Sequence, residues 1–426
     1  MSRTTISVFE HERLVLGETR ETREGGRLKL TQAHFDALVR FNERSDRRYI
    51  SIGYRQIRFR HYVGFLQIGE FGIEVLPKID SLSEDRTPYR EALLDMLRMT
   101  GGLRIQNPSE ASLAARRGTL LDLYIVSFLD LCDGLLREGL TRGYRRVQAN
   151  QPVFRGRLVT TQHLRHNLVR ADRVYTEHQV YDHEIVVNQA LVSALGELDR
   201  LPLAHGLRTR VQRCRAALPE SLGGLPSLAA LDRVVLGRNT SRYRHALEFV
   251  RLILTHRAPT LRTGRLPVLA VLLDMNQLWE RYVLALLRAV APEGIRVDGQ
   301  SSRAFWRPDS PGERSRKVRP DIVVHDGRGG DVLAILDTKW KIPKGGRAAI
   351  GDLGQMFIYN ELFACPHAVL VYPGHGVTTV RQSGRFESAV HRCSTVCLSL
   401  LRPGTFSRSF ARERAREFLD RLLPKA

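Results

Sequence analysis

The 426-residue sequence has few cysteines and lacks a long apolar run. Its five cysteines do not combine with histidines at the spacing of a zinc site, so we expect reduced, structural thiols. No apolar stretch reaches the roughly 18 to 20 residues that span a bilayer. The first residues also lack the apolar core of a signal peptide. Together these absences predict a cytoplasmic protein that does not bind a membrane.

Lysine is rare as well, although basic residues dominate the charge. The sequence has 66 Lys and Arg against 45 Asp and Glu, a formal net charge of +21. Such an excess favours a polyanionic partner, because clustered cations bind phosphates and release counterions. An arginine-rich composition can also follow from the base composition of a genome, so a generic basic surface stays an alternative. Because Lys is scarce, a Lys falls within a chemical motif of this sequence by chance less often than a common residue would.

The chain is long enough for two or three domains, and its first half divides into two parts. Residues 1–80 show period-two alternation around one helix, predicted from Thr31 to Asn42, which indicates a β-rich domain with a small curled sheet or barrel. Residues 81–265 are mainly helical, with an extended, loop-rich piece near their middle. The Pro and Gly residues around Ala258 to Leu266 predict a linker.

Residues 266–426 change character again. We expect helices over Asp274–Val290 and Gly351–Phe363 and strands at Ile322–Val324, Val332–Asp337 and Ala368–Tyr372. The order helix, strand, strand, helix, strand implies an α/β domain with a mixed sheet. The predicted fold class is therefore a multidomain α/β protein.

One strand of this domain ends in a carboxylate and an ammonium group. The segment Val332–Lys339 is apolar until Asp337, as expected of a buried central strand. Alternate residues of a strand point to one side, so Asp337 and Lys339 project together and Thr338 faces the other way. Burying two charges is costly unless they pair or bind a metal. The alternative is a surface ion pair at a strand edge, which the preceding apolar run disfavours.

A second carboxylate begins the preceding strand. Asp321 follows Pro320, and a Gly-rich turn connects its strand to the strand of Asp337. If the two strands pair, both carboxylates lie at one end of the sheet. They would form a hard oxygen site suited to Mg²⁺, with Mn²⁺ also possible, and Lys339 could orient or help deprotonate an attacking water. The alternative for Asp321 is an ordinary turn residue after Pro.

Three further side chains are candidates for the same site. Glu280, on the helix ahead of the strands, is a candidate outer carboxylate for the metal and its water, or else a solvated helix carboxylate. Gln355 and Tyr359 are four residues apart on the following helix and share one face. Gln355 is a candidate to hold water or phosphate, and Tyr359 a phosphate oxygen.

The site residues resemble the PD-(D/E)xK pattern, and the chain as a whole resembles the McrC family, the nuclease subunits of McrBC modification-dependent restriction systems. The resemblance runs in order through five segments: Val63–Ile79, Leu140–Tyr144 with Arg155–Leu158, Arg319–Val324, Ile335–Lys341 and Asp352–Tyr359. An ordered set of this kind is more specific than a lone Pro-Asp and Asp-x-Lys.

The resemblance implies a Mg²⁺-dependent endonuclease that cuts DNA together with a McrB-like AAA+ GTPase ring and stimulates that GTPase. It assigns residues 266–426 to a PD-(D/E)xK nuclease domain and residues 1–80 and 81–265 to partner docking. The absence of a G-x-x-x-x-G-K-[ST] loop agrees with this, because no nucleotide is then expected to bind this chain.

Arginines in the middle region are candidate contacts to DNA or to the partner, since Arg forms bidentate contacts with phosphates and carboxylates; these are Arg142, Arg145, Arg146, Arg155 and Arg157. A solvated basic surface is the alternative for each. Two other functions stay open at this stage. They are an activator or adaptor of an AAA+ ring that does not cut, and a stand-alone PD-(D/E)xK nuclease.

Overall fold

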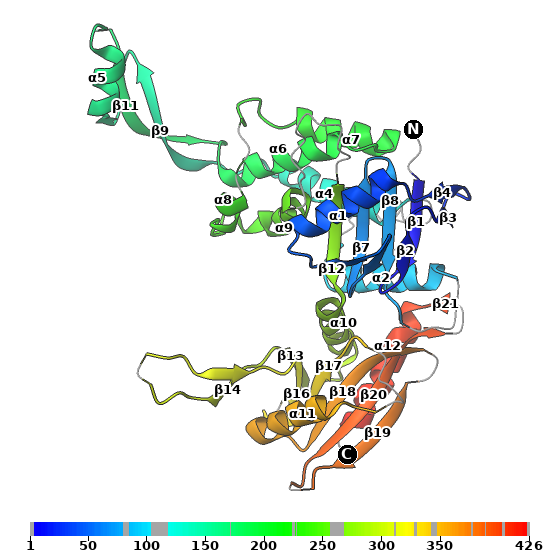
Figure 1. Ribbon diagram of the computed structural model, residues 1–426. Coiled ribbons are helices and arrows are strands. Elements are labelled where there is room, and N and C mark those ends of the chain that lie inside the picture. The colour runs from blue at the N-terminus through cyan, green and yellow to red at the C-terminus, as the bar shows by residue number, and fades with distance from the viewer. Residues whose placement is uncertain are drawn as a thin grey trace. The chain divides into compact units, whose positions relative to one another are not determined.

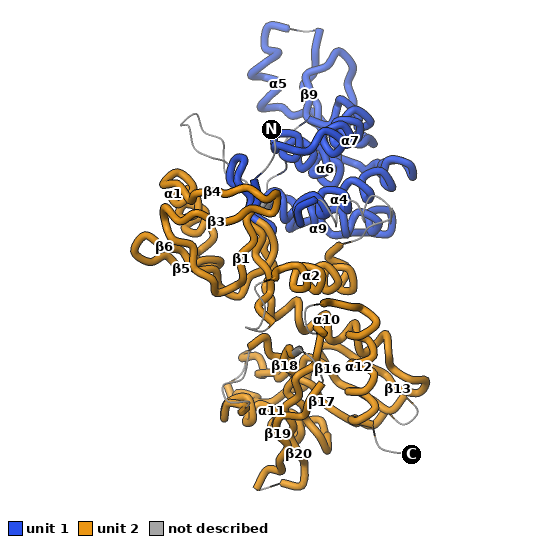
Figure 2. Tube along the Cα trace, turned by 90° about the vertical axis from the view of Figure 1, so that its right-hand side faces the viewer, with its two compact units in different colours: residues 1–5, 66–72, 105–271 blue, residues 6–65, 73–104, 272–426 orange. Residues whose placement is uncertain are grey.

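The computed structural model describes residues 4–79, 85–103, 118–170, 172–223, 226, 228–255, 268–310, 312–327, 330–341, 347–375, 378–387, 389–402 and 405–423. The chain divides into two compact units, each assembled from separate segments (Figure 2). Unit 1 comprises residues 1–5, 66–72 and 105–271, and unit 2 comprises residues 6–65, 73–104 and 272–426. The predicted linker at 258–266 lies outside the described residues. No described helix is long and apolar enough to cross a membrane.

The N-terminal region is rich in strands, as the alternation predicts. Its largest sheet has the order β1-β8-β7-β12, built from β1 (Thr4–Phe9), β8 (Phe71–Leu76), β7 (Tyr62–Ile68) and β12 (Val268–Asp274). Two smaller sheets contain β2 (Arg13–Val15), β6 (Gln56–Phe59) and β5 (Ile50–Gly53), and β3 (Thr19–Glu21) with β4 (Arg27–Lys29). The helices are α1 (Gln32–Arg44), which Thr31 caps, and α2 (Thr87–Met99). The late strand β12 is the element that the sequence pattern does not place here.

Beyond α2, the middle region contains five described α-helices and a β-arm that carries a sixth. The helices are α4 (Leu120–Arg137), α6 (Val186–Asp199), α7 (His205–Ala216), α8 (Leu228–Asp232) and α9 (Arg244–Thr255), with a 3₁₀ turn at Ser241–Tyr243. The arm pairs β9 (Gly143–Gln151) antiparallel with β11 (Val174–Asp182), and it carries β10 (Arg157–Leu158) and α5 (Thr160–Asn167) at its far end (Figure 1). The extended piece expected within a mainly helical region is thus a long hairpin.

The C-terminal region forms a mixed sheet, as predicted, and this sheet has seven described strands where the sequence indicated three. The order is β13-β16-β17-β18-β20-β19, with β21 beside β20: β13 (Ile295–Gly299), β16 (Ile322–Asp326), β17 (Val332–Thr338), β18 (His367–His375), β20 (Arg392–Arg402), β19 (Thr379–Arg385) and β21 (Thr405–Phe406). β17 pairs antiparallel with β16 and parallel with β18. These central strands are apolar because both of their faces are covered.

Three helices flank this sheet, and a separate hairpin leaves it. The helix α11 (Ile350–Phe363) packs Met356 and Phe363 against one face of the strands, and α12 (Arg408–Leu422) lies behind the other (Figure 1). The third helix, α10 (Met275–Val290), is capped by Asp274, whose side chain accepts a hydrogen bond from the Asn276 backbone. The hairpin of β14 (Arg303–Trp306) and β15 (Arg316–Val318) stands between β13 and β16 in the chain.

Candidate active site

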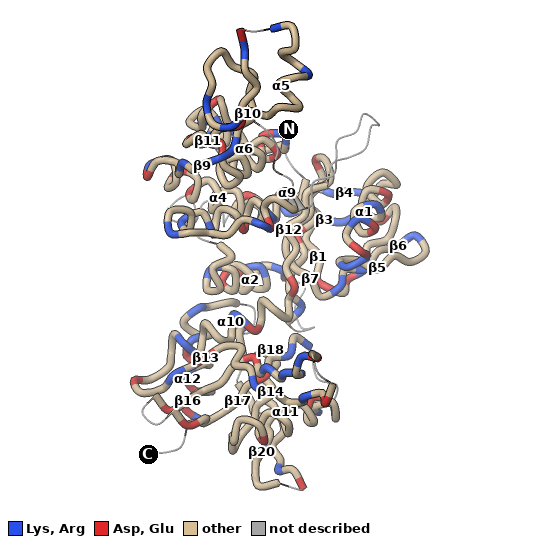
Figure 3. Tube along the Cα trace, turned by 90° about the vertical axis from the view of Figure 1, so that its left-hand side faces the viewer, with Lys and Arg blue, Asp and Glu red and all other residues tan. Residues whose placement is uncertain are grey.

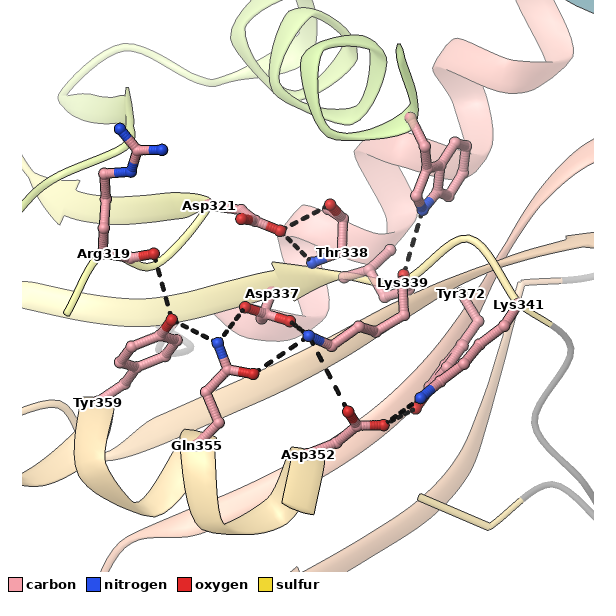
Figure 4. A network of polar contacts seen from close by, with 12 residues as sticks. Arg319, Asp321, Asp337, Thr338, Lys339, Lys341, Asp352, Gln355, Tyr359 and Tyr372 are labelled. Carbon is pink, nitrogen blue, oxygen red and sulfur yellow. Dashed lines mark hydrogen bonds and ion pairs between the residues drawn. The ribbon is translucent and has the colours of Figure 1, made fainter. Parts of the chain in front are cut away.

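The candidate site begins at the end of β17. The strand is buried from Ala334 to Thr338, and the Asp337 side chain at its end is also buried. Lys339 Nζ lies 2.5 Å from Asp337 Oδ2, so the two charged groups expected on one side of the strand are in direct contact (Figure 4). The backbone of Lys339 continues the sheet, because its N–H donates to the Val371 carbonyl.

Asp321 lies immediately before the neighbouring strand β16 and is held by Thr338, which was expected to face away from Asp337. β16 and β17 pair with Ile322 opposite Leu336, which brings Asp321 to the end of β17. The Thr338 backbone N–H and hydroxyl both donate to Asp321 Oδ2, each at 2.7 Å. Within the described part of the chain, Asp321 Oδ1 has no hydrogen bond. Thr338 therefore positions one carboxylate, while Asp337 beside it supplies the other.

Gln355 connects the residues of this site. Its Nε2 donates to Asp337 Oδ1 at 3.2 Å, and its Oε1 accepts from Lys339 Nζ at 3.1 Å. The same Nε2 lies 2.6 Å from the Tyr359 hydroxyl, which in turn donates to the Arg319 carbonyl. Burial raises the pKa of Tyr359 to about 12, so the phenol stays a donor. The predicted face of α11 thus meets the end of β17 (Figure 4).

Two residues that the sequence analysis did not propose extend the network. Asp352 Oδ2 lies 2.6 Å from Lys341 Nζ, and Asp352 Oδ1 lies 4.0 Å from Lys339 Nζ. Asp352 precedes Gln355 by three residues. The helical spacing that places Gln355 and Tyr359 on one face therefore also places Asp352 on that face. The Lys341 signal was its position two residues after Lys339.

Glu10 is a further contact of this region that no local pattern indicates. Trp340, the residue after Lys339, donates its indole N–H to Glu10 Oε1 at 2.5 Å. The Lys78 backbone N–H donates to the same oxygen at 2.9 Å. Burial raises the pKa of Glu10 to about 7. The end of the candidate catalytic strand therefore packs against a buried acid 330 residues away in sequence.

Glu280 is near the site but is not joined to it. Its Oε1 accepts a hydrogen bond from Gln300 Nε2 at 2.8 Å. Burial, together with the charge of Asp321, raises the pKa of Glu280. Among the described residues, no three His, Cys, Asp or Glu side chains are grouped closely enough to hold a metal ion. The structure thus brings Asp337, Lys339, Gln355 and Tyr359 into one network, sets Asp321 beside it, and leaves Glu280 outside.

The electrostatics of the two aspartates fit a hard cation. Burial, reinforced by the Asp321 carboxylate, raises the pKa of Asp337, and Lys339 opposes that shift. Two carboxylates at one buried strand end destabilise each other, and a cation offsets this repulsion. The donors are all oxygen, with Asp321 Oδ1 not otherwise engaged by a described residue, which is the chemistry that Mg²⁺ and Mn²⁺ prefer. The residues present therefore fit a two-carboxylate site completed by water.

The five candidate arginines of the middle region lie on or beside the arm, in unit 1. Arg145 forms ion pairs with Asp182 and Glu184, and Arg157 pairs with Glu177. The Arg142 side chain donates to His183. The remaining two, Arg146 and Arg155, are exposed and make no hydrogen bond or ion pair with any residue that the structure describes. These two guanidinium groups are therefore the least engaged of the five among the described residues, although the charge of Arg146 acts on Glu177.

Gly156, which lies between Arg155 and Arg157, has a backbone conformation that requires glycine. Its φ is +72°, in the left-handed region that favours glycine. A Cβ built there would meet the Glu177 carbonyl oxygen at 2.2 Å. The Arg-Gly-Arg segment is therefore a turn that brings β10 onto β11.

Comparison with known proteins identifies the family. The sequence profile described as "McrBC 5-methylcytosine restriction system component" matches residues 57–373. No curated protein matches the chain significantly. A chain from the refined half-complex of the tetradecameric assembly of Thermococcus gammatolerans McrB AAA+ hexamers with bound McrC has 20% identity and a TM-score of 0.65, over 99% of this chain and 100% of that one.

A chain from the cryo-EM structure of the Thermococcus gammatolerans McrBC complex matches less well, with 21% identity, a TM-score of 0.47, and coverage of 68% of this chain and 89% of that one. The profile match covers most of the sequence, including Asp321, Asp337 and Lys339. The protein therefore belongs to the family of McrBC 5-methylcytosine restriction system components.

Proposed function

We propose that the protein is the DNA-cutting subunit of a McrBC-like restriction system and that residues 266–426 are a PD-(D/E)xK nuclease domain. The observation that carries the proposal is the network in which Gln355 contacts both Asp337 and Lys339 at a buried strand end. A purely structural ion pair does not need a second, half-buried carboxylate beside it. Asp321 adds that charge at a cost in stability, which a catalytic cation would offset.

The residues of the chain have separate tasks in this proposal. Lys339 orients the attacking water or offsets the negative charge that develops on the phosphate. Gln355 holds Lys339 and Asp337 in their relative positions through its two amide atoms. Tyr359 fixes the backbone of Arg319, two residues before Asp321. A Mg²⁺ or Mn²⁺ held by Asp321 and Asp337, with Glu280 as an outer carboxylate through water, would lower the pKa of the nucleophilic water and stabilise the transition state.

The partner in this proposal is a McrB-like AAA+ GTPase ring. The similar fold comes from an assembly of McrB AAA+ hexamers with bound McrC. The far part of the arm exposes several apolar side chains, as expected of a protein-docking surface: Val153, Phe154, Leu164, Leu168 and Val169. Arg146 and Arg155 supply exposed cations on the same arm. We infer that the arm contacts the ring and that this contact stimulates GTP hydrolysis.

The test is to measure cutting and GTPase stimulation together, using the full chain and its AAA+ partner on methylated duplex DNA. Asp337→Ala and Lys339→Ala should each abolish cutting, because several kcal/mol of transition-state stabilisation are lost, while GTPase stimulation persists. Asp420→Ala, at an exposed position on α12, is the matched control. Mg²⁺ or Mn²⁺ should support cutting, whereas Ca²⁺ should bind without turnover. Undiminished cutting by Asp337→Ala, or in excess EDTA, would contradict the assignment.

The two alternative functions give different results in the same assay. An adaptor that does not cut would stimulate GTP hydrolysis and leave DNA intact in the unmodified protein. A stand-alone nuclease would cut without the partner. The network around Gln355 favours the cutting subunit over the adaptor, because an adaptor does not require buried charges to be held at hydrogen-bonding distance.

A further inference from the structure

The β14–β15 hairpin exposes aromatic rings to solvent. Phe305 and Trp306 are consecutive residues of β14 and are 51% and 54% exposed. Every residue of β14 is exposed, so the strand has no core to cover. Aromatic rings of this size are usually buried, and their exposure on a short hairpin indicates a surface that contacts something else.

The same hairpin is strongly basic. Residues 300–319 contain two acidic residues, Asp309 and Glu313, against six basic ones: Arg303, Arg307, Arg314, Arg316, Lys317 and Arg319. In the part of the chain that the structure describes, none of these six forms an ion pair. Figure 3 shows basic segments at β14. Unpaired cations beside exposed aromatic rings match a polyanion that also offers flat or apolar surfaces, which is the chemistry of nucleic acid.

Both ends of the hairpin are fixed to the candidate active site. At its start, the Gln300 backbone N–H donates to the Asp321 carbonyl at 2.9 Å, and the Gln300 side chain donates to Glu280. At its end, the Arg319 carbonyl accepts a hydrogen bond from Tyr359. The hairpin is therefore attached at Asp321, one of the two carboxylates proposed to bind the metal.

An arginine at the base fixes the direction of the hairpin. The Arg303 guanidinium lies 4.5 Å from the centroid of the Phe363 ring and donates to the Leu362 carbonyl at 2.5 Å. Both contacts are with α11, the helix that carries Gln355. Arg303 thus has a structural task, and the other five cations are available to a ligand.

We propose that the β14–β15 hairpin is a binding element for double-stranded DNA beside the scissile phosphate. The cations of β15 contact backbone phosphates, and Phe305 and Trp306 pack against sugars and base edges of a groove. The inference rests on the proposed nuclease function, because it takes the substrate of that site to be DNA. It assigns a substrate-binding role to a segment that joins the network of Figure 4 only through the Arg319 carbonyl.

The experiment measures DNA binding by the full chain without cutting. A fluorescein-labelled 40-base-pair duplex is titrated in EDTA and followed by anisotropy. The double variant Phe305→Ala/Trp306→Ala and the triple variant Arg314→Gln/Arg316→Gln/Lys317→Gln should each weaken binding at least tenfold. The triple variant should also reduce the dependence of log Kd on log salt by about 0.9 for each phosphate contact that is lost.

Matched controls test whether the loss of DNA binding is specific to the hairpin or follows from removing any exposed ring or any surface cation. Tyr54→Ala removes a 90% exposed aromatic ring from another hairpin of unit 2. Arg412→Gln/Arg416→Gln removes exposed cations from α12. Both controls should bind the duplex within about twofold of the unmodified protein. If Phe305→Ala/Trp306→Ala lowers the melting temperature, the triple variant at surface positions carries the test.

The outcomes of the two proposals can be told apart. Wild-type DNA affinity in the triple variant would overturn the hairpin assignment, whatever Asp337→Ala does to cutting. Loss of AAA+ partner binding with DNA affinity intact would also overturn it, because the hairpin would then be a protein contact. If the hairpin variants lose DNA binding while Asp337→Ala still cuts, the proposed active site fails and the hairpin assignment stands.

Discussion

At the scale of single residues, Gln355 is the side chain on which the geometry of the site depends. Its amide contacts the acid on one side and the amine on the other, so neither Asp337 nor Lys339 can rotate freely. We expect Gln355→Ala to slow single-turnover DNA cutting about 10- to 100-fold, the usual cost of removing a group that orients catalytic residues. GTPase stimulation should not change. Gln212→Ala, an exposed glutamine on α7, is the control, and an unchanged cutting rate for Gln355→Ala would contradict this role.

Glu10 gives a pH-dependent contribution to stability. Burial raises its pKa from 4.5 to about 7, so the folded protein holds this proton more tightly than the unfolded chain does. Stability from this group is fully present below pH 4.5 and is lost as pH rises through 7, at a cost of about 3 kcal/mol above that pH. Glu10→Gln avoids the buried charge, and its amide oxygen can still accept from Trp340 and Lys78.

The measurement is thermal unfolding of Glu10→Gln and the unmodified protein at pH 5 and pH 8. The variant should be the more stable protein at pH 8, and the difference should shrink at pH 5. Glu387→Gln, at an exposed position, should show no such change. An equal difference at both pH values would mean that Glu10 does not titrate as the burial of its carboxylate predicts.

At the scale of elements, the sequence predicted the helices and strands that are determined by local features, namely apolar periodicity and helix caps. The buried strand β17 was predicted by its apolar run, and α11 by its helical spacing. The N-terminus of α10 follows from its cap at Asp274. The side-by-side placement of Asp337, Lys339 and Gln355 follows from the same patterns, because the strand end and the helix face are both fixed by periodicity.

Features that depend on contacts between residues far apart in the sequence, or that lack an apolar pattern, were not predictable. The pairing of β12 into the N-terminal sheet joins segments about 200 residues apart, and no local pattern records such a register. The arm was expected only as extended chain, because β9 has no buried face and so lacks the apolar alternation of a core strand. The contact of Glu10 with Trp340 likewise depends on folding, since a lone Glu after a strand predicts only a surface acid.

The arm leads to a prediction at this scale. Gln151 pairs with Val174, so replacing residues 152–173 by Asn-Gly closes the hairpin with a two-residue turn. This change removes exposed apolar residues, Arg155 and Arg157, and no buried apolar side chain, although the buried Asn167, which pairs with Asn150, is also lost. We expect stimulation of the partner's GTPase to fall at least tenfold, with the melting temperature nearly unchanged.

Point variants of the arm test whether its positive charges, rather than its length and apolar surface, are needed for GTPase stimulation. Arg146→Gln and Arg155→Gln, whose guanidinium groups form no hydrogen bond or ion pair with a described residue, should reduce stimulation several-fold. Arg157→Gln serves as the control, because Arg157 is already engaged by Glu177. Full stimulation by the shortened arm would show that the partner binds elsewhere.

At the scale of the whole molecule, each compact unit is assembled from segments that lie far apart in the sequence. Unit 2 combines residues 6–65 and 73–104 with residues 272–426. Its halves share buried polar contacts: Trp340 with Glu10, the Tyr282 hydroxyl with Asp95 at 2.9 Å, and the Arg408 side chain with the same Asp95. Whether boundaries near 80 and 265 separate independently folding domains stays a prediction, and these contacts favour mutual dependence.

A split protein tests this dependence. If residues 1–265 and 266–426 are expressed as separate chains, each half of unit 2 loses partners for groups such as Asp95 and Tyr282 that are buried in the intact protein. Leaving buried polar groups unpaired costs roughly 1–3 kcal/mol each, which is large against the stability of a small domain. We therefore expect the tagged C-terminal chain to be unstable alone and to purify together with residues 1–265 when the two are co-expressed. Asp95→Ala should weaken that association, whereas Asp36→Ala, at a partly exposed position of α1 where the carboxylate contacts only Gln32 of the same helix among the described residues, should not. A C-terminal chain that purifies alone with the melting temperature of the intact protein would establish an independent nuclease domain instead.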